Sequence, residues 1–318
     1  MLYSLLWRAR RLGLLAALLV LGGLPTARAQ QKMQVVTRTL EQSWPCPPGA
    51  VVRIRAEKAT VQVRAWDQPT VRVTLRLSAR HAERAVAEQD LPVAQYRLQK
   101  NGNGFDLLNF FELPAGAPAV RADLRAEFIV WMPAANPLQV ANAYGQTDLA
   151  DLGGGLALEQ SFGKIALRDL RGTLTVTARY ADLTGTNLQA NFTCEANKSA
   201  VLLLGLGGSC VVHNFYGSVR VQPTAALRKL TLETDRSEVV ISVPQLEQFA
   251  YQLSTQQGSL TVPATYAAAR RGTEARATLT VAAPTRPLVR ASTTYAPLTL
   301  QTQPLPPVPL GISSTLKP

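Results

Sequence analysis

The chain has 318 residues, a formal net charge of +12 and three cysteines. Three cysteines cannot all pair within one chain, which excludes a scaffold built from disulfides. Lys and Arg are spread among acidic residues rather than gathered in one stripe, so the composition indicates no nucleic-acid partner.

Residues 1–29 have the order of a secretory signal peptide. Three arginines precede the apolar run Leu12–Leu24, and the small-residue sequence Ala27-Arg-Ala29 follows it. The run is too short to cross a bilayer of about 30 Å as a helix, so we expect cleavage after Ala29 rather than a membrane anchor. Cleavage removes four arginines and lowers the charge from +12 to +8. We therefore predict an exported protein without a transmembrane span, in the periplasm, at the cell surface or outside the cell.

After a lead-in over residues 30–49, alternating apolar residues predict β-strands. Residues 57–66 and 70–77 alternate with period two and are divided by the turn sequence Asp67-Gln-Pro69. Residues 79–89 are rich in Ala, Glu and Arg and predict a short helix. Residues 124–131 predict another strand, which Met132-Pro133 ends.

The middle of the chain is a strict repeat of 18 residues that spans 145–216. Its blocks begin at Gly145, Gly163, Ala181 and Ser199, and a fifth begins at Gly217. Aliphatic residues recur at the same positions of each block, and a small residue recurs every nine positions. A repeat this short cannot bury its own apolar side, so its copies must stack. We therefore predict an all-β fold, a single-stranded parallel β-solenoid with 18-residue coils and two short strands per coil.

Beyond residue 217 the spacing lengthens to about 20 residues, and Pro223 and Pro244 interrupt the pattern. Whether residues 217–300 continue the same stack is left open. We expect one β-strand-repeat domain over 50–300, followed by a proline-rich disordered tail over 301–318.

Three motifs resemble a known family, the bacterial β-strand-repeat "putative adhesin" domain of Bacteroidetes-like exported proteins, a domain of unknown function. They are the strand phrase Ala59-Thr-Val-Gln-Val-Arg-Ala-Trp-Asp67, the strand end Val130-Trp-Met-Pro133, and the aromatic-Gly pairs at 144, 162 and 216. The resemblance covers about residues 50–300. It implies a solenoid-like all-β fold and supplies no catalytic residues. Ala181 and Lys198-Ser199 depart from the pattern, which puts the corner there in doubt.

One column of the repeat is aromatic and is a candidate ligand-facing surface: Tyr144, Phe162, Tyr180 and Tyr216. These residues lie at a predicted corner, so their direction is not fixed by the periodicity. An outward column would offer rings to sugars, whereas an inward column would only support packing.

A second candidate surface is an outward-facing column that contains Glu159 and Glu195, with Thr177 between them and His213 in the following block. Two carboxylates in one groove are what a glycosidase needs, but two coils separate this pair by roughly 10 Å, slightly beyond the spacing of inverting enzymes. We therefore assign no catalytic residue. The test is geometric, because convergence of the two side chains in a deep groove would favour an enzyme.

Neither a metal nor a cofactor is predicted. The only histidines are His81 and His213, which excludes a multi-histidine metal site. Asp151, Asp169 and Asn187 form a column that could bind Ca²⁺, but Asx residues that cap their own turns are the favoured interpretation. Cys194 and Cys210 are predicted roughly 8 Å apart and unpaired, as small buried groups.

The sequence therefore predicts an exported, non-enzymatic β-repeat protein that acts as an adhesion or cell-envelope scaffold module. Its partner would be an envelope polysaccharide or another surface protein. The alternative is a polysaccharide-active enzyme, a lyase or hydrolase, because parallel β-helices also carry such activities.

Overall fold

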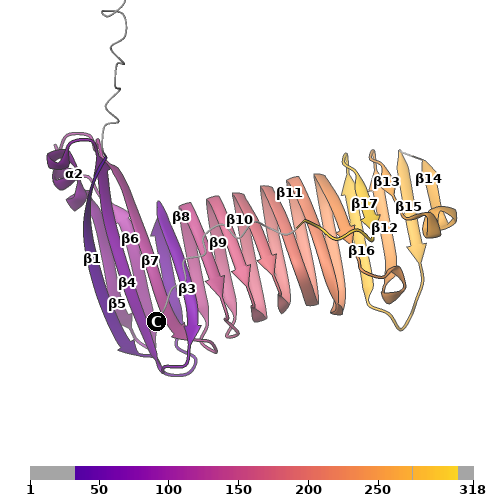
Figure 1. Ribbon diagram of the computed structural model, residues 1–318, viewed down its shortest axis with the longest axis horizontal. Helices are drawn as coiled ribbons and strands as arrows, with labels where there is room; N and C mark the ends of the chain where they lie inside the picture. Colours follow the sequence, from indigo (N-terminus) through magenta and orange to yellow (C-terminus); the bar gives the residue numbers. More distant parts are fainter. Residues whose placement is uncertain (1–32, 274, 307–318) are drawn as a thin grey trace, which may run out of the picture.

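The computed structural model describes residues 33–306 except residue 274, and these residues form an all-β protein (Figure 1). The predicted signal peptide and the end of the predicted tail lie outside the described residues. Strand makes up 70% of the structure and helix 7%.

The 17 strands of the described residues belong to one mixed sheet. The N-terminal strands are β1 (Gln34–Pro45), β2 (Val52–Glu57), β3 (Ala59–Trp66), β4 (Thr70–His81), β5 (Ala94–Asn101), β6 (Gly104–Phe111) and β7 (Asp123–Pro133). The central strands are β8 (Leu138–Ala150), β9 (Leu156–Arg168), β10 (Arg171–Thr186) and β11 (Gln189–Ser242). The C-terminal strands are β12 (Ala250–Gln256), β13 (Leu260–Thr261), β14 (Arg270–Thr273), β15 (Arg276–Val281), β16 (Leu288–Thr294) and β17 (Leu298–Gln301).

The described helices are short. The predicted helix over 79–89 is present as α2 (Arg84–Asp90), while residues 79–81 still belong to β4. Three 3₁₀ helices lie in connections between strands: η1 (Leu91–Val93), η2 (Leu246–Gln248) and η3 (Ala264–Ala269).

The 18-residue period sets the register of the central strands. Leu156 of β9 lies opposite Leu174 of β10 and Leu138 of β8, and β10 pairs with β11 at the same offset, always in parallel. Each repeat therefore adds one layer of strand to the sheet, which we call a rung. Like residues of successive repeats lie side by side in neighbouring rungs. In Figure 1 these rungs stand in a row along the long axis of the molecule.

The predicted single-stranded parallel β-solenoid is wrong. The sheet is mixed and is not a closed solenoid, because antiparallel pairs flank the parallel rungs at both ends. β1 with β4, β4 with β7 and β5 with β6 are antiparallel, as are β12 with β15 and β14 with β15. Equal repeats impose parallel pairing only where they follow one another without interruption, and outside that region hairpins reverse the chain.

The two short strands expected per repeat are also wrong. In β8, β9 and β10 each rung is one long strand that bends at a residue with positive φ, such as Phe162 in β9 (φ 61°), and β11, with 54 residues, runs through several rungs without a break. Both halves bury alternate side chains, and Leu158 before the bend and Ile165 after it belong to the same hydrophobic core. The bend therefore allows one strand to line the core twice.

The stack changes order at both ends. β2 and β3 lie between β8 on one side and β6 and β7 on the other, although the chain reaches β8 last. Likewise β16 and β17 lie between β11 on one side and β12 and β13 on the other. The region after residue 217 thus continues the parallel rungs through β11. The last rung in the sequence, β16 with β17, lies next to β11, and the rung that precedes it in the sequence, β12 with β13, lies beyond it.

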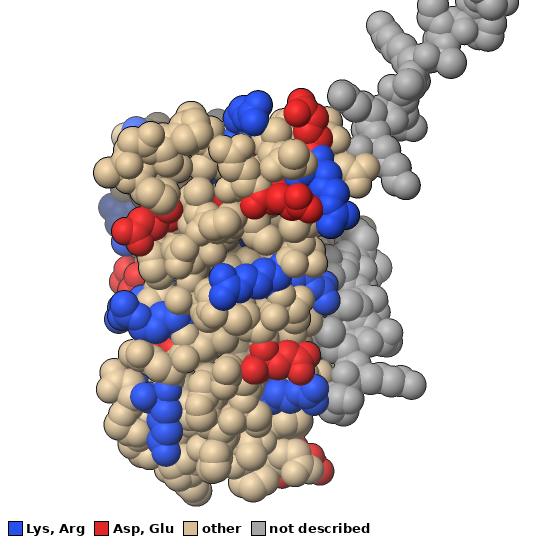
Figure 2. Space-filling model, turned by 90° about the vertical axis from the view of Figure 1, so that its left-hand side faces the viewer, with Lys and Arg blue, Asp and Glu red and all other residues tan. Residues whose placement is uncertain are grey.

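Basic and acidic side chains are interspersed on the end of the sheet that carries β1 and α2 (Figure 2). Several form ion pairs there, including Arg84 with Glu88 at 2.7 Å and Arg125 with Asp123 at 2.9 Å. This end of the molecule therefore carries no patch of one sign.

Candidate functional site

Every rung bends outward at one corner, where a line of exposed side chains runs along the sheet. We call this line the corner spine. In spatial order its members are Lys58, Tyr144, Phe162, Tyr180, Lys198, Tyr216, Arg236, Tyr295 and Gln257, all with φ between 48° and 61°. Lys198-Ser199 stands where the other corners have an aromatic-Gly pair. Lys198 takes the same left-handed conformation, so the backbone of that corner does not differ.

The four predicted aromatic residues face outward, and their exposure ranges from 36% at Tyr216 to 60% at Tyr144. Phe162 stacks on Tyr144 with ring centroids 4.8 Å apart and on Tyr180 at 5.1 Å, with interplanar angles of 4° and 13°. Because the ring faces cover each other, the spine presents ring edges and tyrosine hydroxyls to solvent. It therefore offers edges and hydroxyls rather than open faces to a sugar.

A buried amide supports this corner from inside, and no repeat column had singled it out. Gln160 is 1% exposed and donates from Nε2 to the carbonyls of Gly145 and Phe162 at 3.1 and 3.0 Å, while its Oε1 accepts from Thr147 Oγ1 at 2.7 Å. An amide can satisfy three partners at once, which suits it to a bend with unpaired backbone groups.

The opposite corner is built from residues that tolerate positive φ. Asp151, Asp169, Asn187 and Gly205 take it in successive rungs, and Asn187 donates from Nδ2 to Asp169 Oδ1. Among the described residues no group of three or more Asp, Glu, His or Cys side chains could hold a metal ion. The Asn187–Asp169 hydrogen bond links two successive rungs, and the capping of their own turns by these residues stays a prediction.

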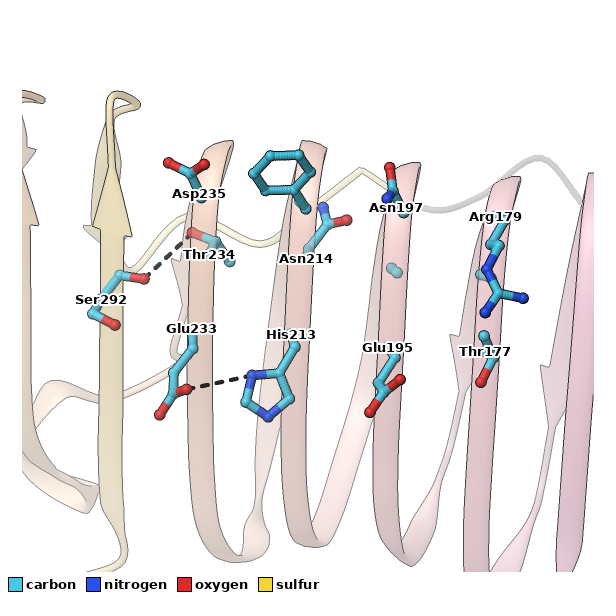
Figure 3. Close-up of a pocket in the computed structure, with 13 residues that line it drawn as sticks. Thr177, Arg179, Glu195, Asn197, His213, Asn214, Glu233, Thr234, Asp235 and Ser292 are labelled. Carbon is cyan, nitrogen blue, oxygen red and sulfur yellow. Dashed lines mark hydrogen bonds and ion pairs between the residues drawn. The ribbon is translucent and has the colours of Figure 1, made fainter.

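An open groove of about 550 Å³ lies on the outer face of β10, β11 and β16, next to the corner spine (Figure 3). Two rows of outward side chains form it. One row is Thr177, Glu195, His213, Glu233 and Ser292, and the other is Arg179, Asn197, Phe215 and Asp235. Each row takes one residue from each successive rung, so the groove crosses the strands.

The charged groups of the groove remain in contact with water. His213 Nδ1 lies 3.3 Å from Glu233 Oε2, and the two side chains are 48% and 54% exposed. Carboxyl groups that act as general acids are usually kept protonated by burial in apolar surroundings, which this pair lacks. The groove is thus equipped to hydrogen-bond a hydrated ligand.

Phe215 is the aromatic member of the groove, and its exposure is 42%. It meets Tyr216 edge to face, with centroids 4.5 Å apart and an interplanar angle of 75°. The stacked spine rings Tyr144 and Phe162 each give a face to a neighbour, whereas no parallel ring stacks on Phe215 among the aromatic contacts of residues 33–306. Phe215 is therefore the aromatic residue through which the groove can stack on a ligand.

The structure separates the two predicted glutamates. Glu195 lines the groove, and Glu159, two rungs away and paired through Thr177, does not. The enzyme hypothesis required both in one deep groove. Glu233 occupies the position of the row that follows His213. The 18-residue repeat did not predict Glu233 there, because the block from Gly217 is two residues longer than 18.

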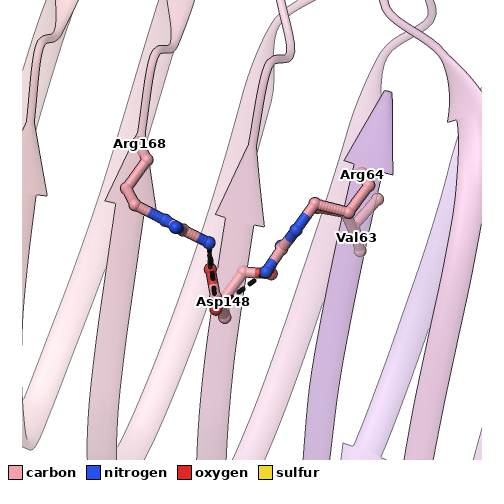
Figure 4. A network of polar contacts seen from close by, with 4 residues as sticks. All are labelled: Val63, Arg64, Asp148 and Arg168. Carbon is pink, nitrogen blue, oxygen red and sulfur yellow. Dashed lines mark hydrogen bonds and ion pairs between the residues drawn. The ribbon is translucent and has the colours of Figure 1, made fainter. Parts of the chain in front are cut away.

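A partly buried ion network lies on the other half of the rungs (Figure 4). Asp148 accepts from Arg64 Nη2 at 2.8 Å and from Arg168 Nη2 at 3.1 Å. Arg64 also donates to the carbonyls of Val63 and Asp148. These contacts join β3, β8 and β9, so the network fastens the inserted N-terminal rung.

The three cysteines are free and buried, as predicted for Cys194 and Cys210. Burial raises the pKa of the Cys194 thiol to about 12 and raises the pKa of Cys210 as well. Neither thiol is a nucleophile at neutral pH.

No family model matches the chain, and no curated protein matches it. Family membership therefore stays a prediction. Solved structures that align with it include a putative cell adhesion protein from Clostridium sporogenes, with 7% identity, a TM-score of 0.27 and coverage of 84% of this chain and 100% of that one. A putative adhesin from Parabacteroides distasonis has 9% identity, a TM-score of 0.38 and coverage of 84% and 97%. A putative adhesin from Bacteroides fragilis has 6% identity, a TM-score of 0.31 and coverage of 83% and 97%.

Within residues 33–306, apart from residue 274, no helix is long and apolar enough to span a membrane. What the fold and site together define is an all-β protein with one mixed sheet and a polar groove across its rungs.

Proposed function

We propose that this chain is an exported, non-enzymatic binding module of the bacterial cell envelope, of an adhesion type, and that its groove holds an extended envelope polysaccharide. The observation that carries the proposal is the groove itself. Carboxylates, an amide, an imidazole and hydroxyls line it at the rung spacing of about 4.8 Å, so a linear polymer meets a polar side chain at each step. Phe215 supplies a ring face for the apolar side of a sugar.

The rival is a polysaccharide lyase or hydrolase that uses the groove carboxylates. Against it stand the exposure of the Glu233 side chain, 54%, and the absence of Glu159 from the groove lining. Catalytic acids of this kind usually lie in buried, apolar surroundings, and the Glu233 side chain does not.

The test is binding of the mature protein to a panel of polysaccharides and to envelope fractions. We expect one polysaccharide to bind, and Phe215→Ala and Glu195→Gln each to weaken that binding by about fivefold or more. Glu88→Gln removes the same charge from α2, far from the groove, and should leave the affinity unchanged. Equal affinity of all three variants would contradict the assignment of the groove.

The same samples decide between binding and catalysis. Incubation of the bound polysaccharide with the protein should release no new chain ends. Release of ends that Glu195→Gln abolishes would overturn the non-enzymatic proposal in favour of the enzyme.

A further inference from the structure

The corner spine has an unexpected composition for its backbone conformation. The left-handed region strains any residue that has a side chain, and Gly, Asn and Asp tolerate it best. The opposite corner follows that rule with Asp151, Asp169, Asn187 and Gly205. The spine instead places aromatic and long cationic side chains there. A turn alone does not require such side chains, so they indicate a role at the surface.

Ring stacking explains only part of the spine. The favourable stacking of Tyr144 on Phe162 and of Phe162 on Tyr180 offsets part of this backbone strain. Arg236 and Lys198 interrupt the ring stack, yet they take the same conformation, with φ of 50° and 52°. The cations are thus the part of the spine that most needs an explanation.

Arg236 is held between two tyrosines. Its Cζ lies 5.3 Å from the ring centroid of Tyr216 and 5.3 Å from that of Tyr295, and its Nη1 donates to the Tyr216 hydroxyl. A guanidinium sandwiched by two rings has lost most of its rotamer freedom in advance, and the Arg236 residue is exposed to solvent. This arrangement is suited to a carboxylate, which guanidinium binds with two parallel hydrogen bonds.

Lys198 stands two rungs from Arg236, on the far side of Tyr216. Its Nζ lies 5.0 Å from the ring centroid of Tyr180 and 3.1 Å from the Tyr180 hydroxyl. Among the ion pairs of residues 33–306, none includes Lys198 or Arg236, although Arg64 and Arg168 pair with Asp148. The acid nearest to Arg236 in sequence is Asp235, whose side chain lines the groove. No carboxylate of the described residues therefore forms an ion pair with either spine cation.

We propose that the line Lys198–Tyr216–Arg236–Tyr295 is a second binding site, separate from the groove, for an acidic polysaccharide. Lys198 and Arg236 are about 10 Å apart across two rungs, too far for one carboxylate to pair with both. A polymer that carries a carboxylate on its successive sugars meets both cations, while the Tyr216 and Tyr295 hydroxyls bind its hydroxyl groups.

The experiment measures binding of the mature protein to polygalacturonate, with neutral dextran as the control polymer. We expect the wild type to bind polygalacturonate and not dextran. Arg236→Gln should weaken binding by about tenfold or more, because a charge-assisted hydrogen-bond pair is lost. Arg236→Lys keeps the charge and loses the planar guanidinium group, so its affinity for polygalacturonate should lie between that of wild type and that of Arg236→Gln. Lys229→Gln removes an exposed cation of the same strand outside the spine and should have no effect.

Galacturonate monomer at equal carboxylate concentration should not compete. The proposal is overturned if wild type fails to bind polygalacturonate, if Lys229→Gln weakens binding as much as Arg236→Gln, or if the monomer competes. Thermal unfolding verifies that each variant is folded. Because these substitutions lie outside the groove, the groove ligand should still bind Arg236→Gln, and failure of this site is thereby distinguished from failure of the proposed function.

Discussion

At the scale of single residues, the corner between β8 and β9 is so tight that backbone meets backbone. Gly163 follows the bend at Phe162 with φ 117°, and a Cβ on it would stand 1.8 Å from the Gly145 carbonyl oxygen. No side chain can give way there, since the obstacle is main chain. The glycine is therefore required by the pairing of β8 with β9.

Gly163→Ala should lower the free energy of unfolding by about 3 kcal/mol, as steric overlap adds to the strain of positive φ. Urea denaturation measures it. Gly102→Ala is the matched control, because Gly102 also has positive φ (57°), yet a Cβ on it would meet no atom within 4 Å. Gly102→Ala should lower the free energy of unfolding by about 1 kcal/mol. Equal losses in the two variants would refute the steric argument.

The buried thiols make the stability of the folded protein fall at alkaline pH. The pKa of Cys194 rises from 9.0 to about 12 in the folded state because burial disfavours the thiolate. Above about pH 9 the unfolded chain loses this proton and the folded chain keeps it. The contribution of the thiol to stability is therefore complete below that pH and falls as pH rises toward 12.

Each such thiol should lower the free energy of unfolding by about 1.4 kcal/mol per pH unit in that window. Urea denaturation curves at intervals of about one pH unit, from neutral pH upward, measure the slope. Cys194→Ala should flatten it relative to wild type, and an unchanged slope would show that the thiol is not protected. In the native protein at neutral pH, a charged thiol reagent should not react.

At the scale of elements, the inserted strand β3 is fastened by one carboxylate. Asp148 and Arg64 are 14% and 12% exposed in their side chains, so removal of the charge from Asp148 leaves a mostly buried arginine unpaired. The network joins three strands, of which β3 is distant in sequence from β8 and β9.

Asp148→Asn should destabilise the protein by about 2–4 kcal/mol, measured by urea denaturation. Glu127→Gln breaks the pair with Arg76, whose side chain is 51% exposed, and should cost less than about 1 kcal/mol. Comparable losses would contradict the distinction between the two pairs.

Repetition located much of the groove at this scale, though not all of it. The period placed Glu195 and His213 in one outward row, and the structure confirms that both line the groove. Glu233 fell outside the predicted row because two extra residues shift its block, and Phe215 lies beside the aromatic column rather than in it. If the longer block is taken into account, Glu233 falls in the row. Phe215 lies two residues after His213 in the same strand, so strand alternation would place it on the same outward face.

At the scale of the whole molecule, strands that return along the sheet cover each of its ends. β16 and β17 are held between β11 and the pair β12 and β13, so the last strands of the chain join elements that precede them. Antiparallel strands then cover the outer edges, which limits edge-to-edge association.

Truncation after residue 284 removes β16 and β17 and should leave an open edge on β11. We expect aggregation and loss of a cooperative thermal transition, seen by size-exclusion chromatography and circular dichroism. Truncation after Pro306 is the control, because every strand pair of the sheet lies before it. A monomeric, cooperative product from the shorter chain would contradict the role of the inserted rung.

Strand character, the 18-residue register and the residue columns followed from the amino-acid order, because equal spacing brings like residues side by side wherever repeats are contiguous. Other features depended on how the whole chain folds. Left-handed corners turned the aromatic column outward, hairpins made the sheet mixed, and the inserted rungs at both ends followed no local pattern. Pairing order depends on which edges remain free when each segment folds, and periodicity carries no information about that choice.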